Sequence, residues 1–359
     1  MMIDLALAIL AAALGLVTLL PFSTSEVWWV RGWDFPRLQL AAVSLVVTVL
    51  TALRLEPSSW LPWSGCVVSG LCFVYQTGRI LPYTPLWNKE VKSASAARGG
   101  RSLRILASNV LISNRDADRL LALVREHDPD VMVTLESDAW WERALRPLER
   151  DYPHRLGQPL ANAYGMHVFS RLRMEDAAVE FLVEKDVPSM HATLVLGSGE
   201  RVRVHFLHPA PPSPTENPRS TERDAELVIV AKRVTRETGP IVVTGDLNDV
   251  AWSRTTRLFR KISRLLDPRI GRGMFNTFNA RWPGMRWPLD HVFHSDHFRV
   301  VKLERLGAIG SDHFPILIEL LLDPRAEQEQ EAPRANSGDE ELAEKKLREV
   351  GRSAAAKRE

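Results

Sequence analysis

Apolar residues are concentrated in three runs within the first quarter of the chain. Residues 5–25 carry no charge, and two further apolar runs cover residues 38–53 and 57–78. A helix rises 1.5 Å per residue, so about 20 apolar residues cross a hydrocarbon core of roughly 30 Å. We therefore predict a membrane anchor over residues 1–82, with about three transmembrane helices at residues 4–24, 38–55 and 58–79.

Two other interpretations of these runs stay open. A cleaved signal peptide would need Lys or Arg before the first run, whereas only Asp4 precedes it. Three buried helices of a soluble core are the second alternative. The membrane interpretation is favoured by tryptophans that flank the runs, since indole rings prefer the bilayer interface: Trp28, Trp29, Trp33, Trp60, Trp63 and Trp87.

Basic residues predict the orientation of this anchor. Arg31 and Arg37 lie between the first two runs, and five more follow the third run: Arg79, Lys89, Lys92, Arg98 and Arg101. With three spans, both groups lie on the same side of a bacterial cytoplasmic membrane, and the positive-inside rule places the C-terminal domain in the cytoplasm. The periplasmic or extracellular side is not excluded, because basic groups beside a phosphate site can serve the substrate instead.

Beyond a small, basic linker at residues 83–102, short apolar segments alternate with amphipathic helical patterns. This pattern predicts a mixed, two-sheet α/β domain over residues 103–322. Strands are expected at 103–110, 131–135, 164–170, 177–183, 191–196, 202–207, 241–244, 291–294, 300–305 and 315–321, and helices at 117–126, 138–148, 219–237 and 253–262. Residues 323–359 mix both charges and lack aromatic residues, which is typical of a disordered tail or a loose helix.

Polar residues that suit metal and proton chemistry stand at the ends of the late strands. Asp246 and Asn248 alternate with a leucine, so in extended geometry they share one face, and Gly245 permits a close backbone approach. Asp290 precedes the next strand, and the pair Asp312-His313 precedes the last. A carboxylate can bind a hard cation, and an imidazole can take a proton from water. Taken singly, the Asp246 segment is equally compatible with a turn and a helix cap, Asp290 with a turn, and a lone Asp-His pair is more often structural.

The early strands end in the same way. Asn109 closes the first strand, Glu136 follows the second, and His208 follows the strand at residues 202–207. All these groups occupy the rim of a sheet, where α/β proteins place their ligands.

In this order, the set resembles the endonuclease/exonuclease/phosphatase superfamily, which includes deoxyribonucleases, apurinic endonucleases, neutral sphingomyelinases and inositol polyphosphate phosphatases. The resemblance rests on the motifs named above together with Tyr164-Gly165 to Ser170-Arg171, Gly245-Asp246-Leu247-Asn248, Leu289-Asp290-His291 and Ser311-Asp312-His313. It implies a four-layer α/β/β/α sandwich that binds one or two Mg²⁺ ions, or Mn²⁺ in their place.

The resemblance also implies roles for these residues. Asn109, Glu136 and Asp312 would be metal ligands. His313 would be the general base that activates water, and Asp290 would orient it. Asp246 and Asn248 would position the water and the phosphate oxygens, while His208 would stabilise the phosphoryl charge or protonate the leaving oxygen.

The substrate is less defined than the reaction. The net charge of +2 argues against a protein that coats nucleic acid. Arg281, Arg286 and Trp287 precede Asp290 and are candidates for substrate binding, with a packed loop as the alternative. The whole arrangement resembles a bacterial membrane-anchored subgroup of the superfamily, some of whose members expose the domain outside.

These features favour a membrane-tethered, metal-dependent phosphoesterase that acts on a lipid-linked or membrane-proximal phosphodiester or pyrophosphate. A membrane-bound endonuclease or exonuclease is the first alternative, although nucleic acid is not the favoured substrate. A non-catalytic membrane-binding protein of the same fold is the second. Nothing in the sequence indicates an obligate protein partner.

Overall fold

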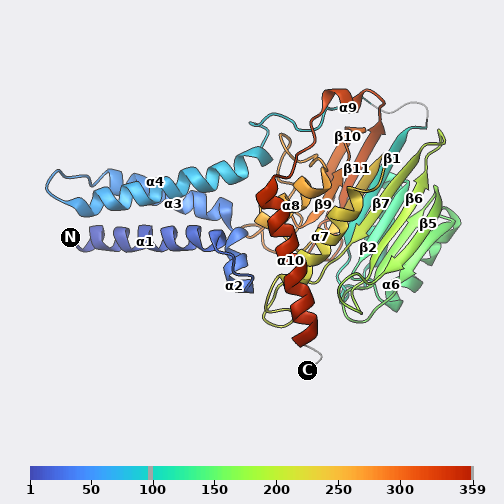
Figure 1. The fold of residues 1–359 in the computed structure, drawn as a ribbon, viewed down its shortest axis with the longest axis horizontal. Helices are drawn as coiled ribbons and strands as arrows, with labels where there is room; N and C mark the ends of the chain where they lie inside the picture. Colours follow the sequence, from blue (N-terminus) through green and yellow to red (C-terminus); the bar gives the residue numbers. More distant parts are fainter. Residues whose placement is uncertain (96–99, 357–359) are drawn as a thin grey trace.

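A computed structural model describes residues 1–95 and 100–356 of the chain. Helices from the N-terminal quarter extend to one side of a globular domain, as Figure 1 shows. They are α1 (Met2–Leu19), α3 (Arg37–Ala52) and α4 (Trp60–Ile80), and shorter helical turns join or follow them: η1 (Leu20–Phe22), α2 (Trp28–Arg31), η2 (Gly32–Asp34) and η3 (Leu81–Tyr83).

The three long helices pack on one another through a small apolar cluster. Ala11, Leu14, Val47 and Cys72 are buried in this cluster. Most of the remaining apolar surface faces outward; Leu16, for example, is 63% exposed. The bundle therefore presents an apolar outer surface in place of the polar surface that a soluble domain normally carries.

The prediction of three transmembrane helices is wrong when length and composition are measured on the described residues. One segment, Met2–Phe22, is long and apolar enough to cross a membrane, with a mean hydropathy of 2.5. A second crossing is counted only if Trp28–Asp34 and Arg37–Ala52, which meet at 69°, form one bent span. α3 has 16 residues and is too short alone, while the 21 residues of α4 include polar groups such as Gln76 and Arg79.

The globular domain contains the two mixed sheets that the pattern predicted. The first has the order β10-β11-β1-β2-β4-β3 and the second the order β5-β6-β7-β8-β9. The strands of the first sheet are β1 (Ser102–Asn109), β2 (Val131–Leu135), β3 (His154–Gln158), β4 (Met166–Ser170), β10 (Phe298–Arg305) and β11 (Ile316–Leu322). Those of the second are β5 (Arg173–Glu180), β6 (Ser189–Val195), β7 (Arg201–Leu207), β8 (Ile241–Asp246) and β9 (Asp290–His294).

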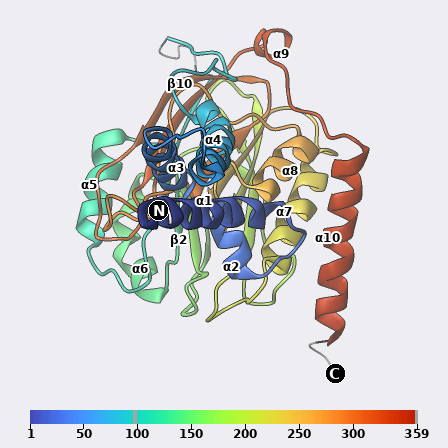
Figure 2. The same cartoon turned by 90° about the vertical axis from the view of Figure 1, so that its left-hand side faces the viewer.

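Helices cover the outer face of each sheet and complete four layers. Figure 2 shows α5 (Ala117–His127) and α6 (Ala139–Ala144) on one side, with α7 (Thr221–Val234) and α8 (Arg254–Ser263) on the other. The central core joins the facing sides of the two sheets, for example Ile105 and Val133 of the first with Val204 and Val242 of the second. α6 is followed by the 3-10 turn η4 (Arg146–Arg150). The α/β/β/α sandwich is therefore observed.

The expected linker, residues 83–102, is in contact with the domain where the structure describes it. Val91 is fully buried, and Glu90 accepts hydrogen bonds from Arg260 at 2.5 and 2.6 Å. The predicted linker residue Arg98 lies outside the described residues.

The C-terminal segment, for which a disordered tail or a loose helix was expected, is largely helical where the structure describes it. Residues 323–359 contain α9 (Ala326–Glu329) and α10 (Ser337–Ala356), and Ala343 of α10 is fully buried against α7 and α8. Lys346 of α10 donates to Asp224 at 2.5 Å and to Glu26 at 3.1 Å. The segment is mostly charged, and its few apolar residues share one face of the helix, so little in its sequence indicates that the helix packs on the domain.

Candidate active site

The topology of the two sheets brings the predicted strand ends to one rim. β1 and β2 run parallel, as do β7 and β8, so each pair ends together. β9 starts at that rim because it runs antiparallel to β8, with Asp246 opposite Asp290 in register. β11 is likewise antiparallel to β1, which places the residues just before it beside Asn109.

A buried amide links two carboxylates from different sheets. The Nδ2 group of Asn109 donates to Glu136 Oε1 at 2.8 Å and to Asp246 Oδ2 at 3.2 Å. Its Oδ1 atom accepts from the backbone N–H of Leu111 at 3.0 Å, which fixes the orientation of the amide. Glu136 also accepts from the backbone N–H of Ile112 at 3.3 Å.

His313 lies between two aspartates. Its Nδ1 atom is 2.7 Å from Asp290 Oδ2, and its Nε2 atom is 3.6 Å from Asp246 Oδ2. The backbone N–H of His313 donates to Ser311 Oγ at 3.0 Å. The first residue of the Ser311-Asp312-His313 motif therefore fixes the backbone of the third, and Asp290 fixes the ring.

His208 and Asn248 complete the set. His208 Nε2 is 3.9 Å from Asp246 Oδ2, and its ring lies 5.4 Å from the ring of Tyr164. Asn248 donates from Nδ2 to the carbonyl oxygen of Pro209 at 3.0 Å, and its backbone N–H donates to Asp246 Oδ1 at 2.9 Å. The seven residues Asn109, Glu136, His208, Asp246, Asn248, Asp290 and His313 thus form one connected group.

Gly245 permits this arrangement, as the sequence predicted. Its φ is +142°, and a Cβ atom there would lie 1.9 Å from the carbonyl oxygen of Leu207. A larger residue would therefore separate β8 from β7 beside the site.

Burial and charge together set the protonation of the central groups. Burial raises the pKa of Asp246 to about 7, although His313 counteracts it, and burial also raises the pKa of Glu136. Burial alone would raise the pKa of Asp290, but the charge and hydrogen bond of His313 hold it below its usual range. Burial opposes a charged His313, yet Asp290 and Asp246 raise its pKa to about 10. Burial lowers the pKa of His208 to about 3, so this ring is neutral at pH 7.

The donor set fits a divalent cation. Asp246 is buried and Glu136 is partly buried, neither forms an ion pair with Lys or Arg among the described residues, and Asp312 lines the same cavity. Carboxylates in such a site without a Lys or Arg partner favour a bound cation, and oxygen ligands suit Mg²⁺ and Mn²⁺. Asp246, Asp290 and His313 also offer three ligand atoms within 4.8 Å of one another. The bond from His313 to Asp290 favours proton transfer for that pair, so Glu136 and Asp312 remain the better ligand candidates. Asn109 directs its Nδ2 group toward Glu136 and Asp246 here, so its oxygen would face a cation only with the amide turned over.

These groups open into a cavity of about 630 Å³ with two different walls. One wall carries Glu136, Asp246, Asn248, Asp312 and His313. The other is apolar and comes partly from the segment that follows α1: Trp28, Trp29, Trp33, Phe35 and Pro36. Phe278, Met285, Trp287 and Leu289 extend this apolar wall.

Of the three candidate substrate-binding residues, only Trp287 lines this cavity. The guanidinium of Arg286 donates to the carbonyl oxygens of Asn279 and Ala280 at 3.3 and 3.1 Å, within its own loop. Arg281 is exposed and does not line the cavity. Its side chain and that of Arg286 therefore do not reach the place where a phosphate could sit.

The aromatic segment at Trp28–Pro36 is the part of the site that sequence reasoning missed. The sequence alone predicts a place at the membrane interface for its tryptophans and no contact with the site. Hydrogen bonds hold the segment on the domain: Trp28 N–H donates to Pro218 O at 3.0 Å, and Trp252 Nε1 donates to Asp34 O at 2.7 Å. No local signal marks contacts between residues about 200 positions apart, although the density of tryptophans is unusual.

Comparison with known proteins agrees with this geometry. Residues 106–313, more than half of the chain, match the Endonuclease/Exonuclease/phosphatase family. The chain belongs to this family, whose members hydrolyse phosphoesters and typically use divalent metals. A search of curated proteins found no match.

Solved structures share the fold at low identity. An endonuclease/exonuclease/phosphatase from Beutenbergia cavernae is 20% identical, with a TM-score of 0.50 over 62% of this chain and 72% of its own. A humanised TDP2 from D. rerio is 14% identical, with a TM-score of 0.52 over 61% of this chain and 99% of its own. The human Nocturnin catalytic domain is 16% identical, with a TM-score of 0.50 over 62% and 96%.

Proposed function

We propose that this protein is a membrane-tethered, divalent-metal-dependent phosphoesterase whose substrate carries a phosphodiester or pyrophosphate on an apolar chain. The observation that carries the proposal is the cavity with one catalytic wall and one aromatic wall. The aromatic wall follows directly on α1, the helix that is apolar enough to enter a bilayer. A substrate held in the membrane by its apolar part would therefore meet the catalytic groups at the surface.

The chain's own residues support hydrolysis by water. Glu136 and Asp312, joined by Asn109 once its amide is turned to present Oδ1, would hold Mg²⁺ or Mn²⁺, which when bound neutralises phosphate charge and polarises the phosphorus centre. The attacking water oxygen bonds to phosphorus, its proton passes to Nε2 of His313, and the bond from phosphorus to the leaving oxygen breaks. Asp290 orients His313 through the 2.7 Å bond to Nδ1. For this step His313 must be neutral, and a nearby divalent cation opposes the two aspartates that raise its pKa.

The other polar residues bind and position. Asp246 and Asn248 line the cavity and would orient the water and a phosphate oxygen. Because His208 is neutral, it would stabilise the phosphoryl oxygens or the leaving oxygen by donating a hydrogen bond, without carrying a charge.

The membrane position rests on the N-terminal helices. α1 exposes Leu5, Leu16 and Leu19, and α4 exposes Leu71 and Val74, each by more than half of its side-chain surface. Such a surface is stabilised by lipid and costs free energy in water. This architecture is what we expect of a membrane-anchored bacterial member of the family.

The test is an assay of the full chain in nanodiscs with Mg²⁺ or with EDTA. Farnesyl pyrophosphate and supercoiled plasmid DNA are the two substrates. We expect Mg²⁺-dependent turnover of the lipid pyrophosphate that EDTA abolishes. Cleavage of DNA without lipid turnover would replace the proposal with a membrane-bound nuclease, and no turnover of either substrate would favour a non-catalytic binding protein.

The side of the membrane needs a separate measurement. Arg31 and Arg37 follow α1, so the positive-inside rule still places the domain in the cytoplasm when α1 is the only span. Paired reporter fusions after Glu359, one active only in the cytoplasm and one active only outside it, decide the orientation. Activity of the external reporter alone would overturn the cytoplasmic assignment.

A further inference from the structure

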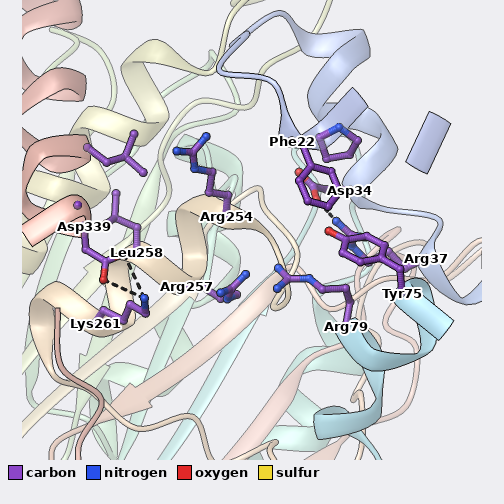
Figure 3. A pocket seen from close by; sticks show the side chains of 13 residues that line it. Phe22, Asp34, Arg37, Tyr75, Arg79, Arg254, Arg257, Leu258, Lys261 and Asp339 are labelled. Carbon is purple, nitrogen blue, oxygen red and sulfur yellow. Dashed lines mark hydrogen bonds and ion pairs between the residues drawn. The ribbon is translucent and has the colours of Figure 1, made fainter. Parts of the chain in front are cut away.

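A second cavity lies where the N-terminal helices meet the globular domain. Its volume is about 570 Å³, and its lining comes from the ends of the N-terminal helices, from α8 and from the start of α10 (Figure 3). None of the candidate catalytic or metal-binding residues lines it. Its charged lining is mostly basic, with Arg37, Arg79, Arg254, Arg257 and Lys261 against Asp34 and Asp339.

Only two of these five cations are neutralised by the protein. Arg37 pairs with Asp34 at 2.5 Å, and Lys261 pairs with Asp339 at 2.8 Å. Within residues 1–95 and 100–356, Arg79, Arg254 and Arg257 form no ion pair. Figure 3 shows the guanidinium groups of Arg79 and Arg257 directed toward each other across the cavity. Three uncompensated positive charges therefore share one cavity.

Buried N–H donors without hydrogen-bond partners also indicate that the cavity suits an anion. Arg37 is 1% exposed, and its Nε group has no hydrogen-bond partner; the buried Nε group of Arg79 has none either. Arg79 makes one hydrogen bond, from Nη2 to the carbonyl oxygen of Trp252 at 2.5 Å. Like charges held together and unsatisfied N–H groups both cost free energy, and an anion in the cavity would relieve both.

We propose that this basic cavity binds the phosphate headgroup of an anionic phospholipid. A planar guanidinium donates two parallel hydrogen bonds to phosphate oxygens, which favours phosphate over a simple halide. Pro21, Phe22, Leu258 and Leu342 line the same cavity and suit the apolar part of a lipid. Both carboxylates of the cavity are paired and no histidine lines it, so the cavity binds phosphate without the groups that would hydrolyse it.

Free phosphate offers the same chemistry, and the position of the cavity favours the lipid. Pro21 and Phe22 end the apolar α1 segment, and Phe22 is 58% exposed with its ring 5.0 Å from that of Tyr75. Basic pockets at the ends of membrane helices are typical sites for lipid headgroups. The lipid source rests on the proposed membrane position of α1, whereas the anion site does not.

Native mass spectrometry of the delipidated full chain in detergent tests this proposal. Equal amounts of short-chain phosphatidylglycerol and phosphatidylcholine are added, and the bound ratio is read for each protein. We expect the wild type to prefer phosphatidylglycerol by about 10-fold, because each arginine near an anionic headgroup contributes to binding. The double variant Arg254→Gln/Arg257→Gln should bring the ratio close to one.

The matched control is Arg143→Gln/Arg146→Gln, which removes two exposed arginines on α6 and η4, far from the cavity. It should keep the wild-type ratio, and thermal midpoints show whether each variant is folded. Equal ratios for wild type and Arg254→Gln/Arg257→Gln would overturn the site. If inorganic phosphate binds through Arg254 and Arg257 while phosphatidylglycerol shows no preference, the lipid source is overturned. Because the readout is binding, a chain without hydrolytic activity leaves this result interpretable.

Discussion

The two cavities lie where the N-terminal helices meet the globular domain, have similar volumes, share one segment of chain and carry opposite charge. Asp34 and Arg37 line the basic cavity, while Phe35 and Pro36 between them line the catalytic cavity. The catalytic cavity contains Glu136, Asp246 and Asp312 without a Lys or Arg partner within the described chain. The basic cavity contains three arginines without an acidic partner.

This difference separates two ways in which a protein can bind phosphate. Arginines bind the anion directly and leave it intact. An acidic cavity repels phosphate unless a cation is present, but the same cation activates the phosphorus centre for attack. The contrast predicts that metal removal abolishes function in the catalytic cavity and leaves anion binding in the basic cavity unchanged.

The largest expected effect follows from the loss of the proposed base. We expect His313→Ala to lower kcat for lipid pyrophosphate hydrolysis by about 10²- to 10⁴-fold, because the variant loses the imidazole that Asp290 holds at 2.7 Å as the proposed proton acceptor. Steady-state kinetics in nanodiscs measure this. His154→Ala, on edge strand β3, is the matched control and should keep wild-type turnover. Unchanged kcat in His313→Ala would remove this residue from the mechanism.

A smaller effect is expected when a proposed metal ligand is changed. Glu136→Gln keeps the shape of the side chain and removes its charge, so the affinity for Mn²⁺ should fall by about 100-fold. Isothermal titration with Mn²⁺ provides the measurement without any substrate. Glu126→Gln removes an equivalent charge from the surface of α5 and should leave the affinity unchanged. Equal Mn²⁺ affinity in the two variants would contradict the ligand assignment.

The apolar wall should have a still smaller effect that depends on the substrate. Trp29 is 51% exposed and lines the catalytic cavity, so Trp29→Ala should lower kcat/KM for farnesyl pyrophosphate by about 10-fold, since apolar contact area is lost. It should leave a small soluble phosphodiester unaffected. Trp87→Ala, which removes a 48% exposed tryptophan outside the cavity, is the control. Equal losses of kcat/KM on both substrates would indicate a structural defect and would exclude recognition of the substrate's apolar part by Trp29.

The smallest expected effect concerns the basic cavity and tests whether its net positive charge determines its preference for an anionic lipid. Asp339→Asn removes the carboxylate that neutralises Lys261 and keeps an oxygen that can accept from Asn336 N–H at the start of α10. We expect the preference for phosphatidylglycerol to rise by about 3-fold, because one more cation becomes available. A reduced preference would show that the cavity does not act through its net positive charge.

Much of the fold could be predicted because the strand pattern is local. The strand at Val131–Leu135 was predicted at its observed bounds, since a short, fully apolar run is typical of a buried strand. β3 was missed because it is an edge strand that contains Gly157 and has no fully buried residue. The packing of α10 on the domain was not predicted, because only a few apolar residues, such as Leu342, Ala343 and Leu347, interrupt its charged sequence.

The candidate site could also be predicted only in part: its catalytic wall was expected from the sequence and its aromatic wall was not. Asn109, Glu136, Asp246, Asp290 and His313 could be found because each one stands at a strand end, and strand ends meet at one rim. The roles of these residues remain predictions. The second wall could not be found, since contacts such as that of Phe35 with Trp287, whose rings are 5.7 Å apart, depend on tertiary packing across most of the chain. The number of transmembrane spans was overestimated because the prediction did not weigh the polar residues that interrupt the apolar runs.

We propose, above all, that the catalytic cavity hydrolyses a phosphate carried on an apolar chain. The most direct test measures kcat/KM of the full chain in nanodiscs with Mg²⁺ on isoprenyl pyrophosphates of 5, 10 and 15 carbons, beside plasmid DNA. We expect kcat/KM to increase with the length of the isoprenyl chain and EDTA to abolish turnover at every length. An equal kcat/KM at every chain length, or cleavage of DNA alone, would contradict it.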